Sequence, residues 1–280
     1  MIFEHFNVAS YIFISLFFLA MIFELVFAFL EKEKYRLIAK PFCLSFLVLF
    51  LLSTFIDQYI VYIAAFFGLI GDVLLMSKKD KCFLTGAFSF LLGHVLYILY
   101  TLIFILNWNI KPYQIIIISI LFVVEFIVLL FVTNKFKISR FEKVGGALYL
   151  TTLTSLIPLF IFALLERPNY MYLALIGSVL FLISDSILSF SRYIKPFKRH
   201  DFYIMLTYLL AQLFIGLGLC LTYVNIWLFI LKIFNEFLKS FRAVRIFIFD
   251  IFTCCTKTCF GFKWIKYRIV AKSVFTFWFI

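Results

Sequence analysis

Five ionisable side chains lie inside otherwise apolar stretches of this 280-residue sequence, and they are the first candidates for chemistry. They are Glu24, Asp72, His94, Glu125 and Asp185, with Gln212 as a polar companion. Placing such a group inside a membrane costs about 2.5–3.5 kcal/mol on insertion scales, so each is a functional hypothesis. Two carboxyl groups in one buried site tend to divide into a protonated and an ionised member, which suits general acid catalysis. Asp72 and Asp185 are the best candidates for that pair.

The composition indicates that these groups sit in a membrane. Hydrophobic residues make up 65% of the chain and charged residues only 14%, and 42 residues are Phe. A soluble domain is nearer half apolar and a quarter charged. We therefore predict an all-α, multi-pass membrane helix bundle. The formal net charge of +12 does not indicate a nucleic-acid partner, because Lys and Arg fall between the apolar segments.

The apolar segments are long enough, at about 20 residues each, to be transmembrane helices. We predict eight, over Val8–Leu30, Leu37–Ile56, Tyr59–Met76, Phe83–Leu106, Tyr113–Thr133, Gly145–Leu165, Met171–Ser191 and Phe202–Val224. Gly71-Asp72-Val73-Leu74-Leu75 resembles Ser184-Asp185-Ser186-Ile187-Leu188 four spans later. This similarity is consistent with a parallel four-plus-four repeat.

The distribution of basic residues predicts the orientation. The connections after the first, third, fifth and seventh spans are rich in Lys and Arg, whereas the other three carry at most one each, Lys111 and Arg167. The positive-inside tendency places the rich connections in the cytoplasm. At a rise of 1.5 Å per residue, Asp72 and Asp185 then lie roughly 6 and 9 Å below that face. Glu24 and Glu125 lie at similar depth, although a paired or snorkelling structural role suits each of them equally well.

Neighbouring residues support a site around the two aspartates. Ser184 and Ser186 flank Asp185, and their hydroxyls are suited to hydrogen-bond its carboxyl group. Above the pair, the cytoplasmic connections carry bases suited to a phosphate head group, and we select Lys78, Lys79, Arg192 and Lys195. For His94, a hydrogen-bonded packing role is the alternative to a place in the pocket.

Motifs around these residues resemble the lysoplasmalogenase family of eight-span membrane proteins. In the first half they are GDVLLM from Gly71 and Gly93-His94-Val95-Leu96-Tyr97; in the second half they are Ser184 to Leu188 and Tyr208-x-x-x-Gln212. Each motif is weak alone, but together they occur in the family's order. The resemblance covers roughly 8–221.

The resemblance implies a hydrolase that cleaves the vinyl-ether bond of lysoplasmalogens. Its products are a fatty aldehyde and glycerophosphoethanolamine or glycerophosphocholine. It implies Asp72 and Asp185 as the catalytic pair and His94, Tyr97, Tyr208 and Gln212 as pocket residues. It also implies an endoplasmic reticulum location if the source is eukaryotic. We predict a lysophospholipid substrate and membrane lipid as partners, and no cofactor.

Vinyl-ether chemistry fits two unlike carboxyl groups. A proton adds to the outer alkene carbon, and water captures the resulting oxocarbenium ion. One carboxyl group must keep its proton, and the other must be ionised to stabilise the cation. We prefer Asp185 as the acid, held by its serines, and Asp72 as the carboxylate, ionised near His94.

Two other functions remain as alternatives. The main one is an ion-coupled transporter that uses the intramembrane carboxylates; the other is a non-catalytic scaffold. Transporter sites usually lie at the midplane on broken helices, whereas these acids are shallow. No short metal-ligand spacing is present, so we predict no metal, and we interpret the six cysteines as ordinary small apolar residues.

The chain beyond the eighth span differs from the rest. We assign residues 1–225 to an eight-span hydrolase domain and residues 226–280 to a basic, apolar tail outside the resemblance. Val224-Asn225 is what a common splice-donor sequence encodes, which favours a translated intron; an interfacial amphipathic appendage is the alternative.

Overall fold

The structure is a computed structural model that describes residues 7–77, 79–106, 112–133, 140–166 and 170–224. Its helices are α1 (Val8–Phe29), α2 (Glu33–Thr54), α3 (Tyr59–Leu75), α4 (Asp80–Tyr100) with the π-helical turn η2 (Thr101–Ile105), α5 (Pro112–Thr133), α6 (Arg140–Glu166), α7 (Met171–Tyr193) and a last helix, His200–Val224. The predicted tail lies outside the described residues.

Each predicted span corresponds to one helix, so the prediction of a polytopic helical bundle is confirmed. Six of these helices are long and apolar enough to cross a membrane, and Tyr59–Leu75 is a shorter apolar helix. The chain is therefore a multi-pass membrane protein. The four-plus-four repeat stays a prediction.

Three helices begin earlier than their apolar segments predict. They begin at Glu33, Asp80 and Arg140, where the sequence suggested Leu37, Phe83 and Gly145. Apolar length marks only the part of a helix that faces lipid, and polar turns can extend beyond it. A carboxylate in the first turn of each helix, Glu33, Asp80 or Glu142, also interacts favourably with the helix dipole.

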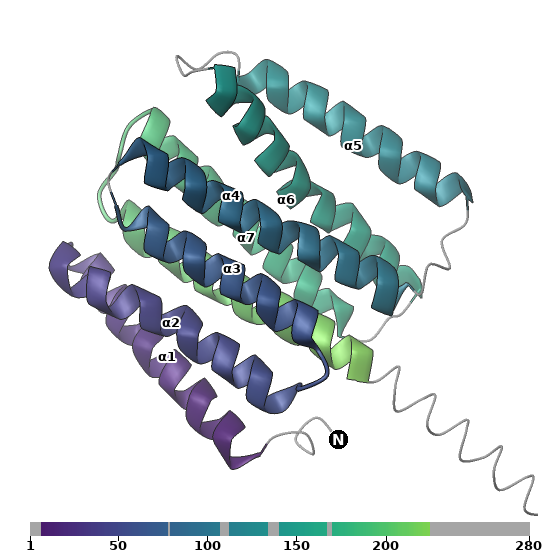
Figure 1. Cartoon of the computed structure of the whole chain (residues 1–280). Helices are drawn as coiled ribbons and strands as arrows, with labels where there is room; N and C mark the ends of the chain where they lie inside the picture. Colours follow the sequence, from purple (N-terminus) through teal and green to yellow (C-terminus); the bar gives the residue numbers. More distant parts are fainter. Residues whose placement is uncertain (1–6, 78, 107–111, 134–139, 167–169, 225–280) are drawn as a thin grey trace, which may run out of the picture. The chain divides into compact units, whose positions relative to one another are not determined.

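Neighbouring helices pack as Figure 1 shows, with α1 beside α2 and α5 beside α6. Contacts also join α2 to α3, α3 to α4, α4 to α6, and α6 to α7. The helix His200–Val224 has the largest buried share of the six candidate spans, 67%, against 17% for Val8–Phe29. It is therefore the central element, and α1 is peripheral.

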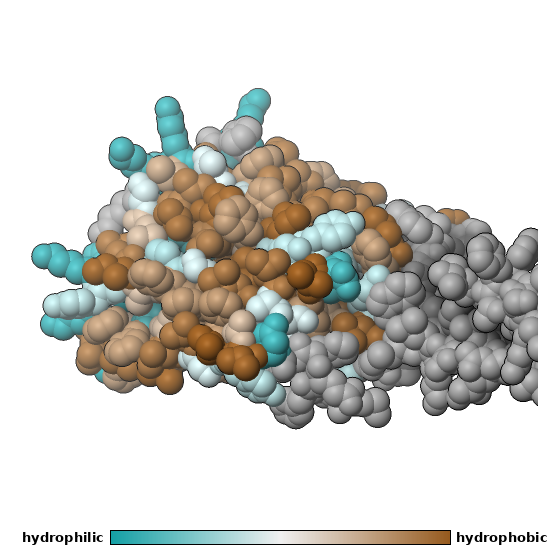
Figure 2. Space-filling view, turned by 60° about the horizontal axis from the view of Figure 1, so that its bottom comes forward, coloured by the Kyte–Doolittle hydropathy of each residue, from teal (hydrophilic) through white to brown (hydrophobic). Residues whose placement is uncertain are grey.

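Lipid-facing surface is apparent from the exposed side chains. Large apolar residues such as Ile22, Phe66, Ile127 and Val179 are exposed on α1, α3, α5 and α7. In Figure 2 apolar residues cover most of the described surface in view, and hydrophilic side chains project from its margins. This arrangement suits a bundle surrounded by lipid.

Candidate active site

Asp72 is buried on α3 and forms an ion pair with a base from the neighbouring helix. The Nζ atom of Lys40, on α2, lies 3.2 Å from its Oδ1 atom. Its other oxygen, Oδ2, has no hydrogen-bond partner among the described residues. The Tyr208 side chain lies close enough to interact with Asp72, but the Tyr208 hydroxyl is not placed to form a hydrogen bond with the Asp72 carboxyl group. Asp72 therefore has one oxygen paired with an ammonium group and one buried oxygen that lacks a hydrogen-bond partner among the described residues.

Asp185 is buried on α7 and has a partner of a different kind. The Tyr149 hydroxyl, from α6, donates a hydrogen bond to its Oδ2 atom. In the described part of the chain no Lys or Arg forms an ion pair with Asp185. The two aspartates therefore occupy unlike environments, one facing an ammonium group and the other a phenol.

The two carboxyl groups belong to one polar cluster. Asp72 and Asp185 are close enough for their charges to interact, and Tyr149 interacts with both. Four helices contribute: α2 supplies Lys40, α3 Asp72, α6 Tyr149 and α7 Asp185. Helices distant in sequence thus bring together the two aspartates that sequence analysis selected.

Aromatic rings surround the cluster. His94, on α4, has its ring centroid 4.7 Å from that of Phe181 and 5.6 Å from that of Tyr149. Both of its ring nitrogens are buried without a hydrogen-bond partner among the described residues. We expected Asp72 to be ionised near His94, but in the structure the ion partner of Asp72 is Lys40. His94 instead lies against the tyrosine that binds Asp185.

A second polar layer lies on the last helix. The Tyr97 hydroxyl donates to Oε1 of Gln212 at 3.1 Å, and both side chains are buried with Tyr208. Gly68 makes room for this layer, since a Cβ atom there would lie 2.9 Å from Nε2 of Gln212 and 3.4 Å from the Tyr208 hydroxyl. The family-type motifs on α4 and the last helix therefore meet beside α3.

The two serines beside Asp185 have other partners. The Ser184 hydroxyl donates to the backbone carbonyl of Ile204 at 3.1 Å, and the exposed Ser186 hydroxyl donates to that of Leu182 at 2.7 Å. Neither serine holds the Asp185 carboxyl group, contrary to our expectation. Adjacent residues on a helix point in different directions, so a hydroxyl from another helix takes that place.

Glu24 and Glu125 differ in their relation to the cluster. Glu24 is fully buried, and Nε of Arg36 lies 3.2 Å from its Oε1 atom. Its charge also interacts with those of Lys40 and Asp72. Glu125, on α5, accepts a hydrogen bond from the Thr154 hydroxyl of α6 at 3.1 Å. Glu24 therefore adjoins the aspartate cluster, whereas Glu125 links two helices.

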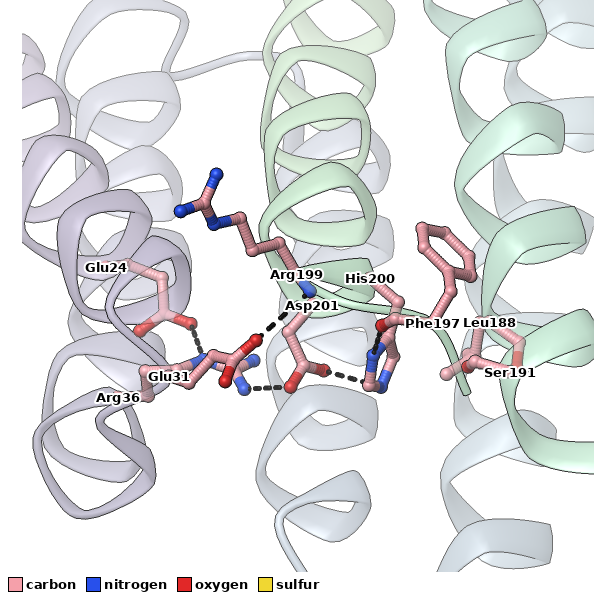
Figure 3. A network of polar contacts seen from close by, with 9 residues as sticks. All are labelled: Glu24, Glu31, Arg36, Leu188, Ser191, Phe197, Arg199, His200 and Asp201. Atoms are coloured by element: carbon pink, nitrogen blue, oxygen red, sulfur yellow. Dashed lines mark hydrogen bonds and ion pairs between the residues drawn. The ribbon is translucent and has the colours of Figure 1, made fainter. Parts of the chain in front are cut away.

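Contacts between two connections lie next to Glu24. Figure 3 shows Arg36 between Glu24 and Asp201, and the backbone N–H of Arg199 directed at Glu31. The α1–α2 connection is thereby joined to the start of the last helix.

The bases selected for a phosphate head group differ in their environments. Arg192 pairs with Asp80 at 2.8 Å and lies 3.7 Å above the Phe83 ring. Lys195 is exposed, Lys79 immediately precedes α4, and Lys78 lies outside the described residues. Arg192 is thus engaged within the protein, and the head-group role of all four stays a prediction.

Lys40 and Tyr149 are site residues that the sequence did not single out. Lys40 lies near the start of a span, where a base is usually a cytoplasmic charge, although the predicted span Leu37–Ile56 already contains it. Tyr149 is one of 15 tyrosines and carried no signal. Within the described residues, no three His, Cys, Asp or Glu side chains gather as a metal site. Cys43, Cys82 and Cys220 are free thiols.

Comparison with known proteins gives one match. The model of the YhhN family matches residues 35–219, which include every member of the polar cluster. No curated protein and no solved structure matches the chain significantly.

Proposed function

Because the chain belongs to the YhhN family, which corresponds to the lysoplasmalogenase family, we propose that it hydrolyses the vinyl-ether bond of lysoplasmalogens. The observation that supports this proposal most directly is the pair of buried aspartates with unlike partners. Lys40 faces Asp72, and Tyr149 donates to Asp185. An ionised and a proton-bearing carboxyl group are what acid-catalysed cleavage of this bond requires.

In the proposed reaction Asp185 is the acid. Its proton adds to the outer alkene carbon of the substrate, and the electron pair of the double bond forms the new C–H bond. The positive charge then spreads over the inner carbon and the ether oxygen. Asp72, ionised beside Lys40, stabilises that oxocarbenium ion through its charge.

Water completes the reaction. It adds to the inner carbon, and one of its protons returns to Asp185, so the acid is regenerated. The resulting hemiacetal collapses to a fatty aldehyde and a glycerophosphoalcohol, with no net consumption of protons. The buried Oδ2 atom of Asp72 has no hydrogen-bond partner among the described residues, so it is an acceptor suited to orient this water.

The placement of the cluster suits a lysolipid. Asp72 lies three residues before the end of α3 and Asp185 eight residues before the end of α7, both toward the end of the bundle that carries Arg36, Arg192 and Lys195. The vinyl ether of a lysolipid lies just beneath its head group. We therefore place the aliphatic chain among apolar helices and the phosphate toward these bases. The family membership further leads us to propose the endoplasmic reticulum membrane as the location if the source is eukaryotic.

The direct test is aldehyde release from an alkenyl lysophospholipid by the purified full chain in detergent. Asp72→Asn and Asp185→Asn should each lower kcat by about 10²–10⁴-fold, the usual contribution of such groups. Glu125→Gln is the control, because Glu125 bonds to Thr154 away from the cluster. A well-folded wild-type protein that releases no aldehyde would exclude this function and favour the ion-coupled transporter.

A further inference from the structure

A row of alternating charges leads from the surface of the bundle to Asp72. From outside inward it comprises Asp201, Arg36, Glu24, Lys40 and Asp72. The exposed fraction of the side chains is 41% at Asp201, 15% at Arg36, 0% at Glu24, 15% at Lys40 and 3% at Asp72. The outer members are those drawn in Figure 3.

The geometry of α2 produces this row. Arg36 and Lys40 are four residues apart and therefore lie on the same helix face. Glu24, from α1, interacts with both of them, and Asp72 approaches Lys40 from α3. Two bases of one helix thus alternate with acids from its two neighbours, so each buried charge has a partner of opposite sign.

Lys40 is the group in this row that decides the charge of Asp72. Among the described residues, the other groups that interact with Asp72 are Tyr208, Tyr149, Asp185, Glu24 and Cys43, and none of these is a cation. A buried carboxylate without a compensating cation is costly enough that it normally takes up a proton instead. Without Lys40, both aspartates would then carry protons, and no anion would face the oxocarbenium ion.

We infer that Lys40 is a positioning residue that keeps Asp72 ionised. The claim that the charge of Asp72 matters for catalysis rests on the proposed hydrolase function. The claim that Lys40 keeps Asp72 ionised does not rest on it, because this claim follows from the 3.2 Å ion pair alone. The two statements can therefore be tested separately.

The test compares Lys40→Met and Lys40→Gln, which remove the charge, with Lys40→Arg, which retains it. Lys34→Met is the matched control, since Lys34 is an exposed lysine on the same helix. All variants are full-length chains purified in detergent, and their melting temperatures are measured. Using both Met and Gln keeps the test decisive if one of them does not fold.

The first readout is infrared spectroscopy of protein labelled with ¹³C-aspartate. Lys40→Met or Lys40→Gln should gain a protonated-carboxyl band that disappears when Asp72→Asn is added. Wild type, Lys40→Arg and Lys34→Met should show only the protonated-carboxyl signal of Asp185, which is lost in Asp185→Asn, and should lack the additional signal that depends on Asp72. A folded charge-removing variant without that additional signal would overturn the inference, whether or not the wild type is an enzyme.

The second readout is aldehyde release. The charge-removing variants should lose about 10²-fold in kcat, the scale of one lost electrostatic contact in a transition state. Their KM should stay within about a factor of 3, because the lost contact acts on the transition state. Lys40→Arg should recover most of kcat. Wild-type kcat in Lys40→Met would refute the catalytic role, and an inactive wild type would refute the proposed function while leaving the infrared result to decide on Lys40.

Discussion

Tyr149 binds Asp185 from α6, a helix that carries neither of the two aspartates. Tyr149→Phe removes only the hydroxyl and should lower kcat about tenfold, because a hydrogen bond contributes about 1 kcal/mol. The matched control is Tyr100→Phe, which removes another tyrosine hydroxyl bonded to a side chain, here Gln58. The measurement is aldehyde release together with melting temperature for both variants.

Comparing these two variants distinguishes an effect on catalysis from an effect on the stability of the fold. Tyr100→Phe should lower the melting temperature about as much as Tyr149→Phe and leave kcat unchanged. An equal loss of kcat in both variants would mean that Tyr149 acts through the stability of the bundle and not through Asp185.

Single residues differ in how far the sequence reveals them. Asp72 and Asp185 could be selected because a carboxylate inside an apolar run is costly and therefore conspicuous. Lys40 resembled an ordinary cytoplasmic charge, and Tyr149 is neutral, so neither carried such a signal. The serines beside Asp185 were a wrong choice of partner because helix geometry directs adjacent side chains apart.

Among the elements, glycines determine how closely α3 and α4 approach. A Cβ atom at Gly71 would lie 2.6 Å from the Phe90 ring, and one at Gly93 would lie 3.0 Å from the Ala64 carbonyl oxygen. Phe90 in turn packs edge-on against Phe181 and Tyr208. The spacing of these two helices therefore fixes the aromatic wall of the site.

Two glycine-to-alanine substitutions should differ in their effect on the stability of the fold. Gly71→Ala forces Phe90 to move and should destabilise the fold by about 1–3 kcal/mol. Gly145→Ala meets nothing within 4 Å and should be neutral or stabilise α6 by up to about 1 kcal/mol. Melting temperatures in one detergent provide the comparison. A loss of equal size in both variants would contradict the close-packing argument.

The positions of the helices were easier to predict from the sequence than the contacts between helices. All eight apolar segments became helices because lipid leaves the backbone no other way to satisfy its hydrogen bonds. Which helix faces which depends on small residues and on single polar contacts, for example Gly177, where a Cβ atom would lie 2.8 Å from the Ala211 carbonyl oxygen. Apolar periodicity alone does not contain that information.

For the whole molecule, the family match ends at residue 219 and the described bundle at Val224. We expect a chain cut after Asn225 to retain the melting temperature and the aldehyde-releasing activity of the full chain. All members of the polar cluster precede that point. The measurement compares the melting temperature and kcat of residues 1–225 with those of residues 1–280. A loss of kcat of tenfold or more in the shorter chain would instead assign the tail a part in the reaction.

The ion pairs described above also imply an order of assembly during synthesis. Arg36 and Glu24 are 12 residues apart, so they can pair as soon as the first two spans have entered the membrane. Lys40 must wait for the third span to bring Asp72. Arg36 gains Asp201, 165 residues later, only when the last helix begins. The Glu24–Arg36 pair of the first hairpin can therefore form early, whereas the contact that fastens this hairpin to the last helix forms only when the bundle is almost complete.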